Sequence, residues 1–110
     1  MTDRSIILGL LLAGSAVATG SLAAQAPATP AYRREVPANL LPQTAITEDS
    51  ARAVALARVP KSMVRALELE REHGHLIWSF DLVVAEKPGI EEVNVDALTG
   101  KIVSVEHEKN

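Results

Sequence analysis

The chain has 110 residues, no cysteine and a formal net charge of −3, and 47% of its residues are hydrophobic. This length allows one domain at most, and the lack of cysteine excludes disulfides and lipid attachment through a cysteine. From Ile46 onward, eight Lys and Arg stand against twelve Asp and Glu. This charge is opposite in sign to that of a nucleic-acid-binding domain, so we expect no nucleic-acid partner.

The N-terminal segment has the layout of a secretory signal peptide. Arg4 precedes an uncharged apolar run from Ile6 to Val17, and small residues follow up to Ala23. We expect a signal peptide at residues 1–23 and therefore a periplasmic or secreted protein. The alternative is an uncleaved anchor, because no charge interrupts Ile6 to Ala24, and only then would a membrane be a partner.

Residues 24–45 are rich in proline, alanine and polar residues, which predicts an extended, disordered linker. Its prolines are Pro27, Pro30, Pro37 and Pro42. The folded domain is then residues 46–110, a size at which a single hydrophobic core is marginal. Such a domain has little room for a buried catalytic pocket.

A helix is predicted to open the domain. Thr47 is the expected N-cap, with Glu48 and Asp49 in the first turn, where the helix dipole favours acids. Small apolar residues then recur at helical spacing, at Ala51, Val54, Ala55 and Val59. Pro60 ends the helix, and the alanines allow it to lie close to a sheet.

Four strands are predicted after the helix, joined by hairpin-sized connections. They are about Met63–Glu72, Leu76–Ala85, Ile90–Asp96 and Lys101–His107. Short connections between consecutive strands favour an antiparallel meander. We therefore expect an α+β fold in which one N-terminal helix packs on a four-stranded antiparallel sheet.

The last connection, Asp96-Ala97-Leu98-Thr99-Gly100, has the chemistry of a tight hairpin. The Asp96 carboxylate can accept backbone N–H groups of the loop, and Gly100 can take a positive φ. With the preceding segments, this hairpin resembles the closing portion of a PepSY domain, a small module of metallopeptidase propeptides and bacterial envelope proteins.

The resemblance covers Ile46 to Glu108 in order: a helix entry at Ile46–Ala51, a helix exit at Val59-Pro60, a first hairpin around Trp78, and the final turn. Lys61 departs from the pattern, because a glycine often follows the proline. The resemblance implies structural roles for Pro60, Trp78, Asp96, Thr99 and Gly100.

Alternation along the strands predicts two faces of opposite character. The helix should cover an apolar face of Leu67, Leu69, Leu76, Trp78, Phe80, Leu82, Val84, Val93, Val95, Val103 and Val105. The opposite face should carry Glu68, Glu70, Glu72, Asp81, Glu92, Asp96, Glu106 and Glu108. Basic residues are nearly absent from it, since Arg65 and Lys101 have the other parity. This face is either a solvated surface or a docking surface for a cationic partner or divalent cations.

The histidines are the first candidates for chemistry. His73, His75 and His107 follow no zinc-ligand spacing, so we interpret them as polar turn residues and expect no metal.

The serines and carboxylates do not predict catalysis either. Ser62, Ser79 and Ser104 lack a nucleophile motif. Carboxylates on an exposed sheet should keep nearly normal pKa values, unsuited to a general acid. We expect neither an enzyme nor a cofactor.

The sequence therefore predicts an exported, non-catalytic interaction module with a protein partner. PepSY domains are thought to inhibit or regulate peptidases, which implies a peptidase or another envelope protein, bound in trans. Two alternatives stay open. One is an envelope sensor that binds cations or a ligand, and the other is an accessory subunit of a membrane complex.

Overall fold

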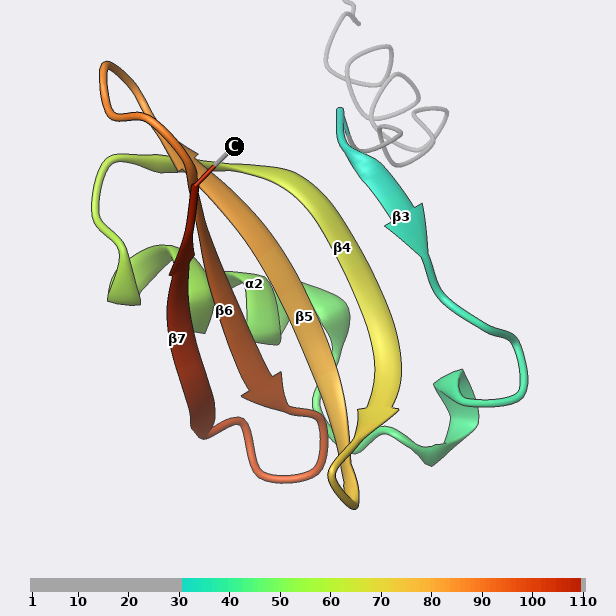
Figure 1. The fold of residues 1–110 in the computed structure, drawn as a ribbon. Coiled ribbons are helices and arrows are strands. Elements are labelled where there is room, and N and C mark those ends of the chain that lie inside the picture. The colour runs from blue at the N-terminus through green and yellow to red at the C-terminus, as the bar shows by residue number, and fades with distance from the viewer. Residues whose placement is uncertain (1–30, 110) are drawn as a thin grey trace, which may run out of the picture.

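The computed structural model describes residues 31–109. Its elements are β3 (Arg33–Glu35), the 3₁₀ helix η1 (Leu41–Gln43), α2 (Glu48–Arg58), β4 (Ser62–Glu72), β5 (His75–Val84), β6 (Ile90–Asp96) and β7 (Ile102–Glu108) (Figure 1). The predicted signal peptide and the linker residues up to 30 lie outside this range. Between residues 31 and 109, no helix is both long and apolar enough to cross a membrane.

The sheet has five strands in the order β3-β4-β5-β6-β7, with α2 lying across one face (Figure 1). Strands β4 to β7 pair antiparallel with their neighbours in sequence. The expected α+β fold, with a helix ahead of a four-stranded meander, is confirmed to this extent.

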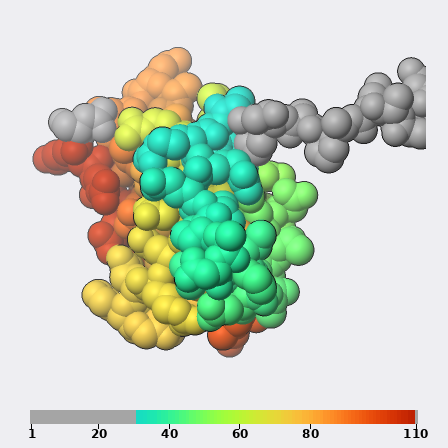
Figure 2. Space-filling view, turned by 90° about the vertical axis from the view of Figure 1, so that its right-hand side faces the viewer, coloured from blue at the N-terminus to red at the C-terminus, as the bar shows by residue number. Residues whose placement is uncertain are grey.

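Strand β3 is a correction to that prediction. Arg33–Glu35 pairs with Ala66–Glu68 in parallel, so the sheet is five-stranded and mixed rather than four-stranded and antiparallel. These residues belong to the segment predicted to be a disordered linker. Figure 2 shows residues 31–45 of that segment running along the molecule beside β4 and the N-terminal part of α2.

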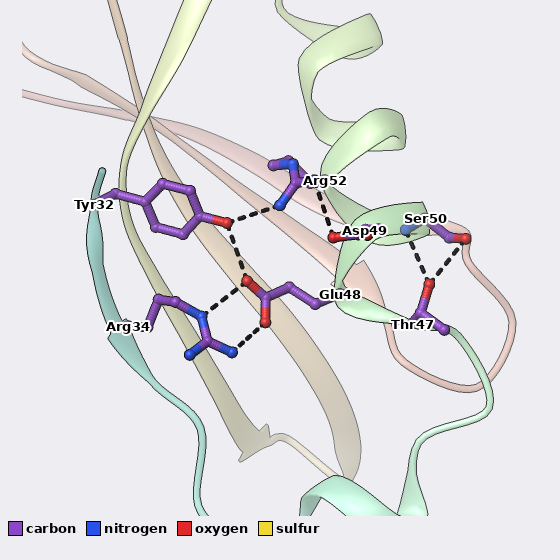
Figure 3. A network of polar contacts seen from close by, with 7 residues as sticks. All are labelled: Tyr32, Arg34, Thr47, Glu48, Asp49, Ser50 and Arg52. Atoms are coloured by element: carbon purple, nitrogen blue, oxygen red, sulfur yellow. Dashed lines mark hydrogen bonds and ion pairs between the residues drawn. The ribbon is translucent and has the colours of Figure 1, made fainter. Parts of the chain in front are cut away.

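The three residues of β3 are all exposed, so the strand is held by its backbone pairing with β4, by polar side-chain contacts, and by the flanking Tyr32 and Val36, which pack against the core. The Arg34 guanidinium donates to the Glu48 carboxylate, and the Tyr32 hydroxyl donates to the same carboxylate at 3.0 Å (Figure 3). Arg52 donates to the Tyr32 oxygen at 2.9 Å and to Asp49 at 2.9 Å. We call Tyr32, Arg34, Glu48 and Arg52 the clasp, since they join β3 to the first turns of α2.

Helix α2 begins and ends as its sequence predicts. The Thr47 hydroxyl accepts the backbone N–H of Ser50 at 3.1 Å, which caps the N-terminus. Val59 is the C-cap, and Pro60 follows it. Ala51 and Ala55 are fully buried against the sheet, so the helix approaches closely.

The core lies between α2 and the sheet. It is formed by Ala51, Ala55, Leu67, Leu69, Leu76, Trp78, Phe80, Leu82, Val93, Val95 and Ala97. Trp78 is fully buried, and its indole N–H donates to the Ile46 carbonyl at 2.9 Å. This bond satisfies the one polar group of the side chain and ties β5 to the entry of α2.

Two register shifts change the predicted alternation. One lies between Val64 and Ala66 in β4, and the other interrupts the pairing of β6 with β7, so that Val95 pairs with Ile102. Val103 is therefore the extra residue of a bulge. It is 43% exposed, and its predicted place in the core was wrong.

Candidate functional site

The face of the sheet opposite α2 carries the predicted carboxylates. The strand register aligns Asp81 with Glu92 and Glu92 with Glu106, and it places Glu68 beside Ser79. We call this surface the acidic face, formed by Glu68, Glu70, Glu72, Asp81, Glu92, Asp96, Glu106 and Glu108. Pairing and alternation bring all eight to one side of the sheet.

The acidic face has a buried floor that the alternation pattern did not predict. Ile77, on the same side of β5 as Asp81, is only 1% exposed, and Ser79 is 6% exposed. Ala66 and Asn94 are also buried. The longer acidic side chains lie next to these buried residues, so they are partly withdrawn from solvent and lose part of their hydration.

This loss of hydration changes the pKa of the acidic side chains, and the change is largest at Glu92. Burial first, and then the neighbouring charges of Glu108, Asp81 and Glu106, raise the pKa of Glu92 to about 7. Burial likewise raises the pKa of Glu70, with Glu68 as the next cause. The expectation of nearly normal pKa values on this face was wrong for these two groups, because solvent does not fully screen them.

Three carboxylates come close together at the β6–β7 side of the face. Oxygen atoms of Glu92, Glu106 and Glu108 all lie within 4.8 Å of one another. Carboxylate oxygens are the ligands that Ca²⁺ prefers in proteins. This cluster concentrates negative charge and is suited to attracting a cation or a basic side chain.

An arginine of β3 reaches the acidic face. Arg33 pairs with Ala66 and lines a small hollow together with Glu68, Asp81 and Glu92. Sequence reasoning missed it, because Arg33 was assigned to the linker and no apolar alternation marks β3. The only hint was the charge of the Arg33-Arg34 pair itself.

Asp96 stands at the end of the face and serves the last hairpin. Its carboxylate accepts the N–H groups of Leu98 at 2.7 Å and Thr99 at 3.1 Å. These backbone bonds, the one from Leu98 first, lower the pKa of Asp96. Gly100 closes the turn with φ of 80°. Of the acidic set, Asp96 is thus the residue with a local structural partner for its charge.

The candidate catalytic residues are not assembled into a site. His73 and His75 lie at the β4–β5 turn, whereas His107 lies at the opposite end of the sheet and contacts Glu91. Ser79 is buried, and the Ser104 hydroxyl accepts a hydrogen bond from Asn94. Within residues 31–109, no serine hydrogen-bonds to a histidine. In this part of the chain, the serines and histidines are therefore not arranged as a nucleophile and its base.

Comparison with known proteins adds one finding. A family model described as PepSY, peptidase propeptide and YPEB domain, matches residues 45–106, from just before Thr47 to the last strand. No curated protein and no solved structure matches the chain.

Proposed function

Because the chain belongs to the PepSY family, we propose that it is a non-catalytic interaction module that binds a peptidase on another chain and regulates it. PepSY is a non-catalytic domain family known in peptidase propeptides and regulators. The observation that carries the proposal is the acidic face, where eight carboxylates share one side of a sheet whose other side is the core.

The acidic face supports docking through its charge. Opposite charges at an interface steer the encounter of two proteins and set their relative orientation. Its acids have few cationic neighbours among residues 31–109, so a partner with basic side chains would relieve their mutual repulsion. We place this interaction in the periplasm or outside the cell, as the signal-peptide pattern predicts.

The test is an activity assay of thermolysin-like peptidases and envelope proteases with the full chain added. We expect inhibition and a detectable complex that weakens as salt is raised. Glu68→Lys, on the exposed rim of the acidic face, should weaken the complex at least tenfold. Glu86→Lys is the matched control, because it makes the same charge change in the β5–β6 turn.

Two results would remove the proposal. One is unchanged peptidase activity with no complex at high micromolar concentration. The other is a complex that both charge reversals weaken equally, because the acidic face would then have no special role.

A second candidate function is a cation-binding sensor in the envelope. It is favoured by the closeness of Glu92, Glu106 and Glu108, whose oxygens lie within 4.8 Å. The two functions separate by thermal unfolding. Millimolar calcium raises the melting temperature only if the folded state binds it.

A role as accessory subunit of a membrane complex would follow only if the leader is retained. The intact mass of the exported protein shows whether the leader has been cleaved.

A further inference from the structure

Strand β7 forms an open edge of the sheet. It is the last strand in the order β3-β4-β5-β6-β7, and within residues 31–109 it pairs with β6 alone. An outer strand presents unpaired backbone N–H and C=O groups that can pair with another extended segment. The other edge differs, because β3 already covers Ala66–Glu68 of β4.

The two sides of this edge have different chemistry. On the acidic face, β7 presents Glu106 and Glu108 beside Glu92. On the side of α2, the helix packs on β4, β5 and β6 and leaves β7 largely uncovered. A groove remains there, with an apolar part formed by Val59, Pro60, Val84 and Val105 and charged residues, Arg58, Lys87 and Glu91, along its border.

Strand β3 shows how a strand added at an edge can contact both faces of this sheet. At the opposite edge, β3 pairs with β4 and sends consecutive arginines to opposite faces. Arg33 lines the hollow of the acidic face with Asp81 and Glu92, and its guanidinium also pairs with Glu35 at 3.3 Å. Arg34 points to the helix side and binds Glu48. A short extended segment is thus held with a basic side chain directed at the carboxylates.

We propose that β7 binds an extended segment of the partner protein in which basic and apolar residues alternate. This deepens the proposed function, on which it rests, by naming the partner's recognition segment. The segment adds as a sixth strand. Its basic side chains lie beside Glu106 and Glu108, and its apolar side chains lie beside Val105 in the groove.

A second copy of this chain is a poorer occupant of the same edge. Antiparallel pairing of two β7 strands keeps the two acidic faces on one side of the joined sheet. It would bring Glu106 and Glu108 of both copies close together, and opposed like charges destabilise strand pairing. Charge complementarity therefore favours a basic segment over self-association.

The test uses the ¹⁵N-labelled full chain and a capped peptide of alternating lysine and valine, seven residues long. We expect amide shifts concentrated in Ile102–Glu108, with little change in Ser62–Glu72. The control peptide has the same composition but groups its lysines and its valines in blocks. It cannot present the two kinds of side chain to opposite faces, so it should bind at least tenfold more weakly.

Two matched variants localise the contact. Glu106→Lys should weaken the alternating peptide at least tenfold, because this residue lies on β7. Glu35→Lys makes the same change on β3, at the opposite edge of the sheet, four strand spacings or about 19 Å away. This exceeds the screening length of about 8 Å at physiological salt, so its effect should stay below threefold.

Equal binding of the two peptides, shifts centred on β4, or self-association of the full chain through β7 would each overturn the inference. The peptidase assay distinguishes a failure of this inference from a failure of the proposed function. A peptidase complex unaffected by Glu106→Lys refutes the β7 contact alone. Peptide binding at β7 with no peptidase complex refutes the proposed regulation and leaves the edge contact standing.

Discussion

Glu92 lies where the acidic face is least hydrated. Its pKa is raised to about 7, first by burial and then by the charges of Glu108, Asp81 and Glu106. The folded-state pKa exceeds the ordinary value of 4.5, so the folded chain keeps this proton between about pH 4.5 and 7 while the unfolded chain loses it. The contribution of Glu92 to stability is complete below pH 4.5 and is lost as the pH rises through 7.

Glu92→Gln removes this charge with little change in shape. At pH 8 the variant should unfold at a higher temperature than the parent, with a gain of about 1 kcal/mol after allowance for solvent screening. At pH 4.5 the difference should nearly vanish, because Glu92 is then mostly protonated. Thermal unfolding at the two pH values measures this. Glu68→Gln, at an exposed position on the same face, is the control, and a Glu92→Gln protein less stable than the parent at pH 8 would contradict the account.

Glu92 shows what the alternation of side chains along a strand can and cannot predict for a single residue. Alternation placed Glu92 on the acidic face, because side chains of a strand point to opposite sides at successive positions. It could not predict the raised pKa of Glu92, which depends on the burial of Glu92 itself and on carboxylates from β5 and β7. Those are properties of the assembled sheet.

At the scale of elements, periodicity was sufficient for α2 and for β4 to β7, because each has a side that enters the core. It was insufficient for β3, whose three residues are all exposed. This strand depends on contacts such as that between Arg34 and Glu48, 14 positions apart, which no local pattern encodes. The β-bulge that exposes Val103 was missed for a related reason, because register depends on both strands of a pair.

The clasp should control how often β3 leaves the sheet edge. The Glu48 carboxylate accepts hydrogen bonds from both Arg34 and Tyr32. Glu48→Gln removes the charge that strengthens these bonds, which costs about 1 kcal/mol of stability at this partly exposed site. A loss of that size raises the population of the detached state about fivefold. Tryptic cleavage after Arg33 and Arg34, followed by mass spectrometry of the full chain, should accelerate by a similar factor.

Asp49→Asn is the matched control for the clasp. It removes an acid from the same first turn of α2, but Asp49 reaches the clasp only through Arg52 and has no hydrogen bond to Tyr32 or Arg34. Cleavage in this variant should stay within twofold of the parent. Equal acceleration in Glu48→Gln and Asp49→Asn would assign the effect to the helix terminus and not to the clasp.

Over the whole molecule, two layers share one core, and their separation depends on two alanines. Ala51 and Ala55 are fully buried where α2 meets the sheet, opposite large side chains such as Trp78 and Phe80. A protein interior has little free volume into which a larger residue could fit. The bond from Trp78 to the Ile46 carbonyl further fixes the entry of the helix, so the layers cannot separate without breaking it.

Ala55→Leu should therefore destabilise the whole fold. The added methylene groups force α2 away from β5 and β6, and overpacking of this kind costs about 1–3 kcal/mol. Urea unfolding followed by Trp78 fluorescence measures the change as a lower midpoint. Ala53→Leu introduces the same side chain on the exposed side of α2, where it should change stability by less than about 0.5 kcal/mol. If Ala55→Leu were as stable as Ala53→Leu, the helix would have room to move outward, and the two buried alanines could not be what sets the separation of the layers.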